Sequence, residues 1–70
     1  MDVRRRLATN MKRLRKMRGW SQERLADECG LDRTYISGIE RMMRHPTITS
    51  VQKIVTALDT SFSELLDPAA

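Results

Sequence analysis

The sequence predicts a small all-α fold, and three features of its residue pattern support this. Apolar residues recur every three or four positions, which is the spacing of one face of a helix. Residues that favour helix N-caps stand before several of these stretches. No stretch has the strict alternation of apolar and polar residues that is typical of a half-buried strand. With 70 residues and no long linker, the chain is expected to form a single domain, residues 1–70.

The first predicted helix carries apolar residues at spacings of four, four and three. This stripe consists of Val3, Leu7, Met11 and Leu14. Such spacing places all four side chains on one face, which we expect to pack into the core. The helix is expected to close at Gly19, and Trp20 then follows as a core residue.

Two shorter helices follow, and very few residues separate them. Ser21 is a suitable N-cap for the second helix, and Gly30 ends that helix where a positive φ is needed. Asp32 then caps a third helix that continues through Arg41. Because the connection is Gly30, Leu31 and Asp32 alone, the two helices cannot lie antiparallel and must cross steeply. This is the helix-turn-helix arrangement.

The C-terminal third is expected to supply a fourth helix and a short fifth one. Thr47 is the expected N-cap of the fourth helix, and Ser61 starts a last turn that Pro68 ends. The residues expected to face inward are Ile48, Val51, Ile54, Val55 and Leu58 in the fourth helix and Phe62, Leu65 and Leu66 in the last turn.

Basic residues are concentrated in the first half of the chain. Residues 1–35 hold ten of the 13 Lys and Arg against five acids, whereas residues 36–70 hold three bases against four acids. After Lys53 every charged side chain is acidic. The N-terminal half is therefore expected to attract a polyanion. A basic run of this kind is equally typical of a solvated helix face, so charge alone leaves both interpretations open.

The outward face of the third helix is small, polar and cationic. Ile36 and Ile39 are expected to anchor this helix to the core. A projection at about 100° per residue places four residues on the opposite side, namely Thr34, Ser37, Gly38 and Arg41. Side chains of these types can approach base edges and phosphates closely. Because glycine in a helix interior costs about 0.5–1 kcal/mol relative to alanine, we expect Gly38 to serve a steric purpose.

The sequence offers little for catalysis, metal binding or membrane insertion. The single Cys29 cannot form an internal disulfide, and with one histidine, His45, it cannot build a metal-ligand cluster. No phosphate-binding glycine-rich loop or nucleophile–base spacing is present. No apolar run approaches the ~20 residues of a membrane span, and the N-terminus has no apolar signal segment. We therefore expect no enzyme activity, no cofactor and no metal, in a cytoplasmic protein.

The segment "WSQERLADECGLDRTYISGIER" resembles the helix-turn-helix of lambda-repressor-like, or Cro/C1-type, DNA-binding domains. The positions that match the family's spacing are Gln22, Leu25, Ala26, Gly30, Leu31, Ile36, Ile39 and Glu40. The tail "PTITSVQKIVTALDTSFSELL" is similar to the family's fourth and fifth helices. Within the family, "DRTYISGIER" and the small size most resemble controller proteins of restriction–modification systems. Phage repressors and antitoxin regulators share much of the pattern.

The resemblance implies a transcription regulator that binds double-stranded DNA in a sequence-specific way. Gln22, at the start of the second helix, would bond a DNA phosphate. The residues that would face the major groove are Arg33, Thr34, Tyr35 and Ser37. Arg33 is the best candidate for a base contact, because its forked guanidinium matches guanine O6 and N7. The residues that would lie near the DNA backbone are Arg41, Arg44 and His45.

Two further expectations follow from the resemblance. It pairs Arg15 of the first helix with Glu40 of the third, and Glu40 lies near the buried side of its helix, where a carboxylate needs a partner. The chain also departs from the family at Met42 and Asp59, where relatives usually or often have glycine. We expect both positions to need a helix-ending conformation that methionine and aspartate adopt less readily.

A homodimer is the expected form of the regulator, because one recognition helix covers too few base pairs to select a site. The end after Lys53 lacks basic residues and carries more apolar residues than one short helical hairpin can bury. The expected interface residues are Phe62, Leu65 and Leu66. Transcription control also makes RNA polymerase a candidate partner.

One alternative belongs to a different class of function. The basic first helix would also suit an amphipathic module that binds a membrane surface or a partner protein. That interpretation requires the apolar stripe of the first helix for binding, whereas the predicted fold needs the same stripe for its core.

Overall fold

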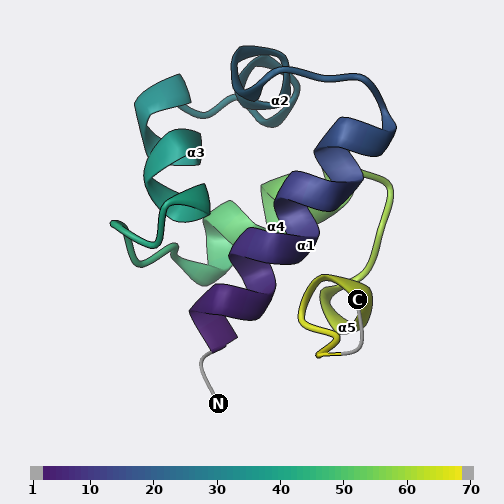
Figure 1. Cartoon of the computed structure of the whole chain (residues 1–70). Coiled ribbons are helices and arrows are strands. Elements are labelled where there is room, and N and C mark those ends of the chain that lie inside the picture. Colours follow the sequence, from purple (N-terminus) through teal and green to yellow (C-terminus); the bar gives the residue numbers. More distant parts are fainter. Residues whose placement is uncertain (1–2, 69–70) are drawn as a thin grey trace.

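Five α-helices form the part of the chain that the computed structural model describes, residues 3–68 (Figure 1). They are α1 (Val3–Met17), α2 (Gln22–Cys29), α3 (Arg33–Glu40), α4 (Ile48–Ala57) and α5 (Phe62–Leu65). No strand occurs within this range. The predicted all-α class and the predicted order of helices are confirmed.

The starts of the last four helices are set by side-chain caps. In each case a hydroxyl or carboxylate oxygen accepts a hydrogen bond from a backbone N–H of the first helical turn, at 2.9–3.0 Å. The capping residues are those that the sequence predicted: Ser21, Asp32, Thr47 and Ser61. Each such cap is worth about 1 kcal/mol.

Two of the turns require a left-handed backbone at residues other than glycine. Met42 has φ 60° just after α3, and Asp59 has φ 51° just after α4. The backbone N–H of each residue donates a hydrogen bond to a carbonyl near the end of the preceding helix. Met42 N donates to Ile39 O at 3.0 Å, and Asp59 N donates to Thr56 O at 3.2 Å. The expected helix-ending conformation is confirmed at both positions.

The core lies where all five helices meet. Figure 1 shows α2 nearly end-on and α3 side-on, so the two cross steeply, as the three-residue connection predicts. α2 also packs against α4, and α1 packs against α3 and α5. The completely buried side chains at the centre are Met11, Leu25, Ile36, Ile39, Ile54, Leu58 and Leu65. Leu14 and Leu66 pack against this core while half-buried.

Three residues that we expected to face inward are exposed. Val3 is 53% exposed, Ile48 82% and Phe62 37%. Each is the first residue of its helix, in α1, α4 and α5 respectively. Because the Cα–Cβ bond of a helical residue tilts toward the helix N-terminus, a side chain at the first position projects beyond the packed segment. The helical spacing of the apolar residues was predicted correctly, but these residues extend beyond the part of each helix that packs in the core.

A buried amide that was not predicted joins the first helix to the last. Asn10 of α1 is almost fully buried. Its Nδ2 donates to the carbonyl oxygens of Leu65 at 2.7 Å and Asp67 at 3.1 Å. The last carbonyls of a helix have no partner within the helix, so Asn10 supplies α5 with a C-terminal cap from a distant element.

We expect Asn10→Ala to destabilise the fold by about 1–3 kcal/mol, because the carbonyls that it satisfies would stay buried without a donor. Urea unfolding followed by circular dichroism measures the loss. Thr9→Ala, at an exposed neighbouring position on α1, is the control and should have little effect. Equal midpoints for the two variants would show that the Asn10 amide does not hold α5.

Candidate nucleic-acid interface

A shallow depression of about 340 Å³ lies along the outward side of α3. Its lining residues are Gln22, Arg33, Thr34, Ser37, Gly38, Arg41, Met43 and Arg44. Six of the eight residues predicted to contact DNA are in this set, although they come from α2, α3 and the following loop. We call this surface the α3 depression. Met43, which is exposed here, was not predicted, and nothing in its sequence context marks it.

The turn between α2 and α3 directs this face outward. Gly30 adopts φ 69°, and the N–H of Leu31 donates to Ala26 O at 3.0 Å, which closes the end of α2. Ile36 and Ile39 then enter the core and hold α3 by its opposite side. Of the polar face that the sequence projected, Thr34 and Arg41 are therefore exposed and Ser37 is half-buried.

The α3 depression is electropositive. Its eight lining residues, all within the described range, include three arginines and no acid. Arg33 and Thr34 occupy the first turn of α3, where the helix dipole adds positive potential. A concave surface lined by one sign of charge concentrates ligands of the opposite sign. This geometry suits a polyanion.

Gly38 is not on open surface, contrary to our projection. It is buried, and a Cβ built there would overlap the Cγ of Arg44. The N–H groups of Met43 and Arg44 donate to Gly38 O at 2.7 and 3.2 Å. The steric purpose expected for this glycine is confirmed, but its close neighbour is the chain's own loop. Gly38 allows the stem of Arg44 to lie against α3, which places that arginine at the depression.

Tyr35 is half-buried beside the α3 depression and holds the next segment. Its hydroxyl oxygen accepts a hydrogen bond from the backbone N–H of Thr47 at 3.2 Å. Burial by itself would raise the pKa of Tyr35, but hydrogen bonds with Ser50 and Thr47 and the charge of Arg44 together lower it. Tyr35 thus ties α3 to the start of α4, and its contact with the major groove stays a prediction.

His45 does not join the predicted DNA-contacting residues. The chain has turned toward α4 by this point, and His45 Nε2 lies 3.2 Å from Arg4 Nη1 of α1. Both residues line an apolar groove of about 370 Å³ on another part of the surface. His45 therefore lies outside the α3 depression, and its position near the DNA backbone stays a prediction.

The apolar groove gathers three of the five large apolar side chains that are exposed in the described chain. Val3, Ile48 and Phe62 line it. Its other apolar lining residues are Leu7, Pro46, Val51 and Leu66. Phe62 and Leu66 were predicted at a dimer interface, and the groove contains both.

Leu65, also predicted at that interface, is not at the groove. Its side chain is fully buried in the core, and its carbonyl is held by Asn10. A side chain without exposed surface cannot contact a second subunit, so Leu65 belongs to the core and is withdrawn from the predicted interface.

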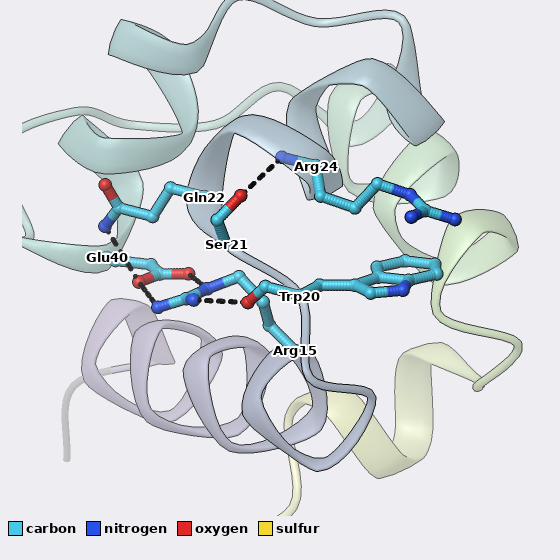
Figure 2. Close-up of polar contacts among 6 residues, drawn as sticks. All are labelled: Arg15, Trp20, Ser21, Gln22, Arg24 and Glu40. Carbon is cyan, nitrogen blue, oxygen red and sulfur yellow. Dashed lines mark hydrogen bonds and ion pairs between the residues drawn. The ribbon is translucent and has the colours of Figure 1, made fainter.

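A buried ion pair fixes α1 to α3 beside the α3 depression (Figure 2). Arg15 Nε donates to Glu40 Oε2 at 2.8 Å and Arg15 Nη2 to Glu40 Oε1 at 3.0 Å. The side chains are 9% and 1% exposed, respectively. Arg15 Nη1 also donates to Trp20 O at 2.8 Å. The predicted pair is confirmed, and it carries an addition that was not predicted: Gln22 Nε2 donates to Glu40 Oε1 at 3.1 Å.

Two basic side chains pack against the ring of Trp20. The guanidinium groups of Arg18 and Arg24 lie 5.2 and 5.1 Å from the centre of its ring, within the range of cation–π contacts. Arg18 Nη2 also donates to Leu58 O, at the end of α4, at 2.8 Å. Part of the N-terminal positive charge therefore has a structural role, and Figure 2 shows the Arg24 side chain beside the Trp20 ring. Trp20 itself is half-buried and packs against the core.

Other groups in the described chain offer little reactive chemistry. Burial raises the pKa of the Cys29 thiol to about 11, so the thiol is protonated at neutral pH. Within residues 3–68, no three side chains of His, Cys, Asp or Glu gather as metal ligands would. In the same range, every helix is too short or too polar to cross a bilayer.

Comparisons with known proteins agree with this geometry. The helix-turn-helix family profile matches residues 11–65. A hypothetical transcription factor of Neisseria meningitidis is 45% identical over 67 residues, 96% of this chain, and the chain spans 63% of that relative's length. A crystal structure of a hypothetical transcription factor from Neisseria has a TM-score of 0.92 at 45% identity, covering 96% of this chain and 77% of the other.

Restriction–modification controller proteins are similar in sequence and in fold. C.AhdI from Aeromonas hydrophila has a TM-score of 0.84 and is 39% identical, over 89% of this chain and 94% of its own. C.Esp1396I, solved as a tetramer in complex with its natural 35-base-pair operator, has a TM-score of 0.83 and is 38% identical, over 93% of this chain and 86% of its own. The chain therefore belongs to the helix-turn-helix family, in its lambda-repressor-like, Cro/C1-type branch.

Proposed function

We propose that this chain is a transcription regulator of the controller type, which binds double-stranded DNA through the α3 depression. The observation that carries the proposal is the convergence of Gln22, Arg33 and Arg41 with small polar residues on one acid-free surface. An α-helix that presents such residues fits the major groove, where arginine reads guanine. The similarity to a controller protein solved with its operator supports the same conclusion.

The regulator is proposed to act as a homodimer that meets through the apolar groove. Val3, Ile48 and Phe62 are exposed there although all three are strongly apolar. Contiguous apolar surface of this kind is typical of a protein–protein contact. A two-fold pair of recognition helices about 34–36 Å apart would match one turn of DNA on a near-palindromic site. We further propose that the regulator acts in the cytoplasm and catalyses no reaction. RNA polymerase is the proposed second partner, because the regulator would control transcription.

The amphipathic-module alternative is weaker, because the core already uses the apolar stripe of α1. Leu7 and Met11 are buried, and Leu14 is half-buried. Only Val3 of the four predicted stripe residues is exposed, and it lines the apolar groove. A helix that bound a membrane surface would have to withdraw these side chains from the core.

Arg33→Ala is expected to lose roughly 1–3 kcal/mol of affinity for the cognate site and to relax the preference at one base step. Gln22→Ala should instead weaken cognate and mismatched sites about equally, because a phosphate contact carries no base information. The measurement is a set of binding curves on single-base variants of a site recovered from genomic fragments that the protein retains.

Gln22→Ala also serves as the control for a general loss of affinity. If Arg33→Ala kept the wild-type preference at every base, base reading would have to be reassigned to Thr34 or Tyr35.

A further inference from the structure

Gln22 lies between a buried carboxylate and the proposed DNA surface. Its Nε2 donates to Glu40 Oε1 at 3.1 Å, and the same side chain lines the α3 depression. Figure 2 shows the amide of Gln22 reaching Glu40 from the first turn of α2, where Ser21 caps the helix. One side chain therefore contacts both the interior ion pair and the surface that would meet DNA.

The contact with Glu40 decides how the Gln22 amide is turned. An ionised carboxylate accepts hydrogen bonds and cannot donate them, so the amide NH₂ must face Glu40 and the amide carbonyl must not. An amide NH₂ has two N–H groups, and one of them is left for another acceptor. Without this contact the last torsion of glutamine is broad and roughly two-fold, so the carbonyl would often take the place of the NH₂.

Glu40 is itself a rigid acceptor. Arg15 binds both of its oxygens, at 2.8 and 3.0 Å, and is in turn held by Trp20 O at 2.8 Å. The Glu40 side chain is 1% exposed, so the carboxylate cannot turn toward water. The orientation imposed on Gln22 is thus set before any DNA arrives.

We propose that Glu40 is a positioning residue for DNA binding: it turns the Gln22 amide so that the free N–H points to a backbone phosphate oxygen. The proposal rests on the DNA-binding function proposed above. Glu40 does not touch DNA in this arrangement. Because Gln22 is already ordered before DNA binds, the entropy cost of ordering this side chain is not subtracted from the binding free energy. This is the general advantage of preorganisation.

Two variants of the ion pair separate this role from a purely structural one. Arg15→Met with Glu40→Leu removes the acceptor for Gln22 but leaves no unpaired charge. Arg15→Lys weakens the fork-shaped pairing but keeps the Glu40 carboxylate and hence the orientation of Gln22. Both are compared with wild type on one duplex, selected by the wild-type protein from a random library. Thermal melting identifies a temperature at which every variant is folded.

The double variant is expected to bind this duplex roughly three- to tenfold more weakly per subunit, the cost of ordering one flexible side chain. Arg15→Lys is expected to bind within about twofold of wild type even where its melting temperature is lower. Adding Gln22→Ala should weaken wild type and Arg15→Lys by a larger factor than it weakens the double variant, in which Gln22 contributes less to binding. The matched control is Arg24→Met with Glu28→Leu, which removes an exposed pair of the same charges on α2.

Two results from the double variant would overturn the positioning role. One is a double variant that binds as tightly as Arg15→Lys, and the other is a loss from Gln22→Ala that is as large in the double variant as in wild type. No loss from Gln22→Ala in wild type would likewise refute it, since Gln22 would then have no contact to position. Failure of the proposed function is distinguishable from all of these, because the wild-type protein would then select no duplex.

Discussion

Replacing Glu40 alone by leucine is expected to destabilise the fold by about 3–5 kcal/mol, because the Arg15 guanidinium would stay buried without its carboxylate. Arg15→Met alone should lower the free energy of unfolding by a similar amount, because the Glu40 carboxylate would stay buried without its guanidinium partner. The two changes together should recover part of the loss, since apolar side chains of similar volume can replace a buried pair, while Trp20 O still loses the hydrogen bond from Arg15. Urea unfolding of the three variants, extrapolated to water, gives the free energies.

The exposed pair of Arg24 and Glu28 is the control for this result. Its side chains are 55% and 41% exposed, so Glu28→Leu, which leaves the contact of Arg24 with Trp20 in place, should cost no more than about 1 kcal/mol. Losses below about 0.5 kcal/mol for both Arg15→Met and Glu40→Leu would contradict the view that the buried pair fixes α1 to α3.

Ile48→Glu is expected to convert the regulator to a monomer and to weaken operator binding by about 10²- to 10⁴-fold, because the second subunit no longer binds at high effective concentration. Ile48 is suited to this test, since it is 82% exposed in the apolar groove and its replacement leaves the core intact. Leu65→Glu is unsuitable, because it would place a charge in the core. Sedimentation equilibrium and operator titration measure the two effects.

Met17→Glu is the matched control for the dimer. Met17 is an exposed apolar residue at the end of α1 that does not line the apolar groove, and its replacement changes the net charge by the same amount. It should leave the protein dimeric. A wild-type chain that remained monomeric, both free and on DNA, would refute the dimer and leave the groove without its proposed occupant.

The helices and much of the DNA-facing surface could be predicted because their signals are local. A cap such as Ser21 or Asp32 acts within one helical turn, and the three-residue connection after Cys29 leaves few geometries. Once Ile36 and Ile39 are buried, helical periodicity determines which side of α3 is exposed. Six residues of the predicted site therefore came together as expected.

The rest depends on contacts between distant residues, which a local pattern does not encode. Periodicity shows which face of a helix is apolar but not where the core ends, so Val3 and Ile48 were assigned inward although they are exposed. Asn10 reaches the carbonyl of Leu65 55 positions away, and this pairing has no signal in either segment. The contact of Gln22 with Glu40 likewise required the crossing of α2 and α3. Gly38 was noticed, but its neighbour Arg44 depended on the path of the loop.

The most direct test of the central claim is the ratio of two affinities of the wild-type protein, measured in the same salt. One duplex is the site that the protein selects, and the other has the same length and base composition in shuffled order. If α3 reads base sequence, the selected duplex should bind about 10³-fold or more tightly than the shuffled one. Equal affinities would show that the basic surface attracts DNA only as a polyanion, and would contradict sequence-specific regulation.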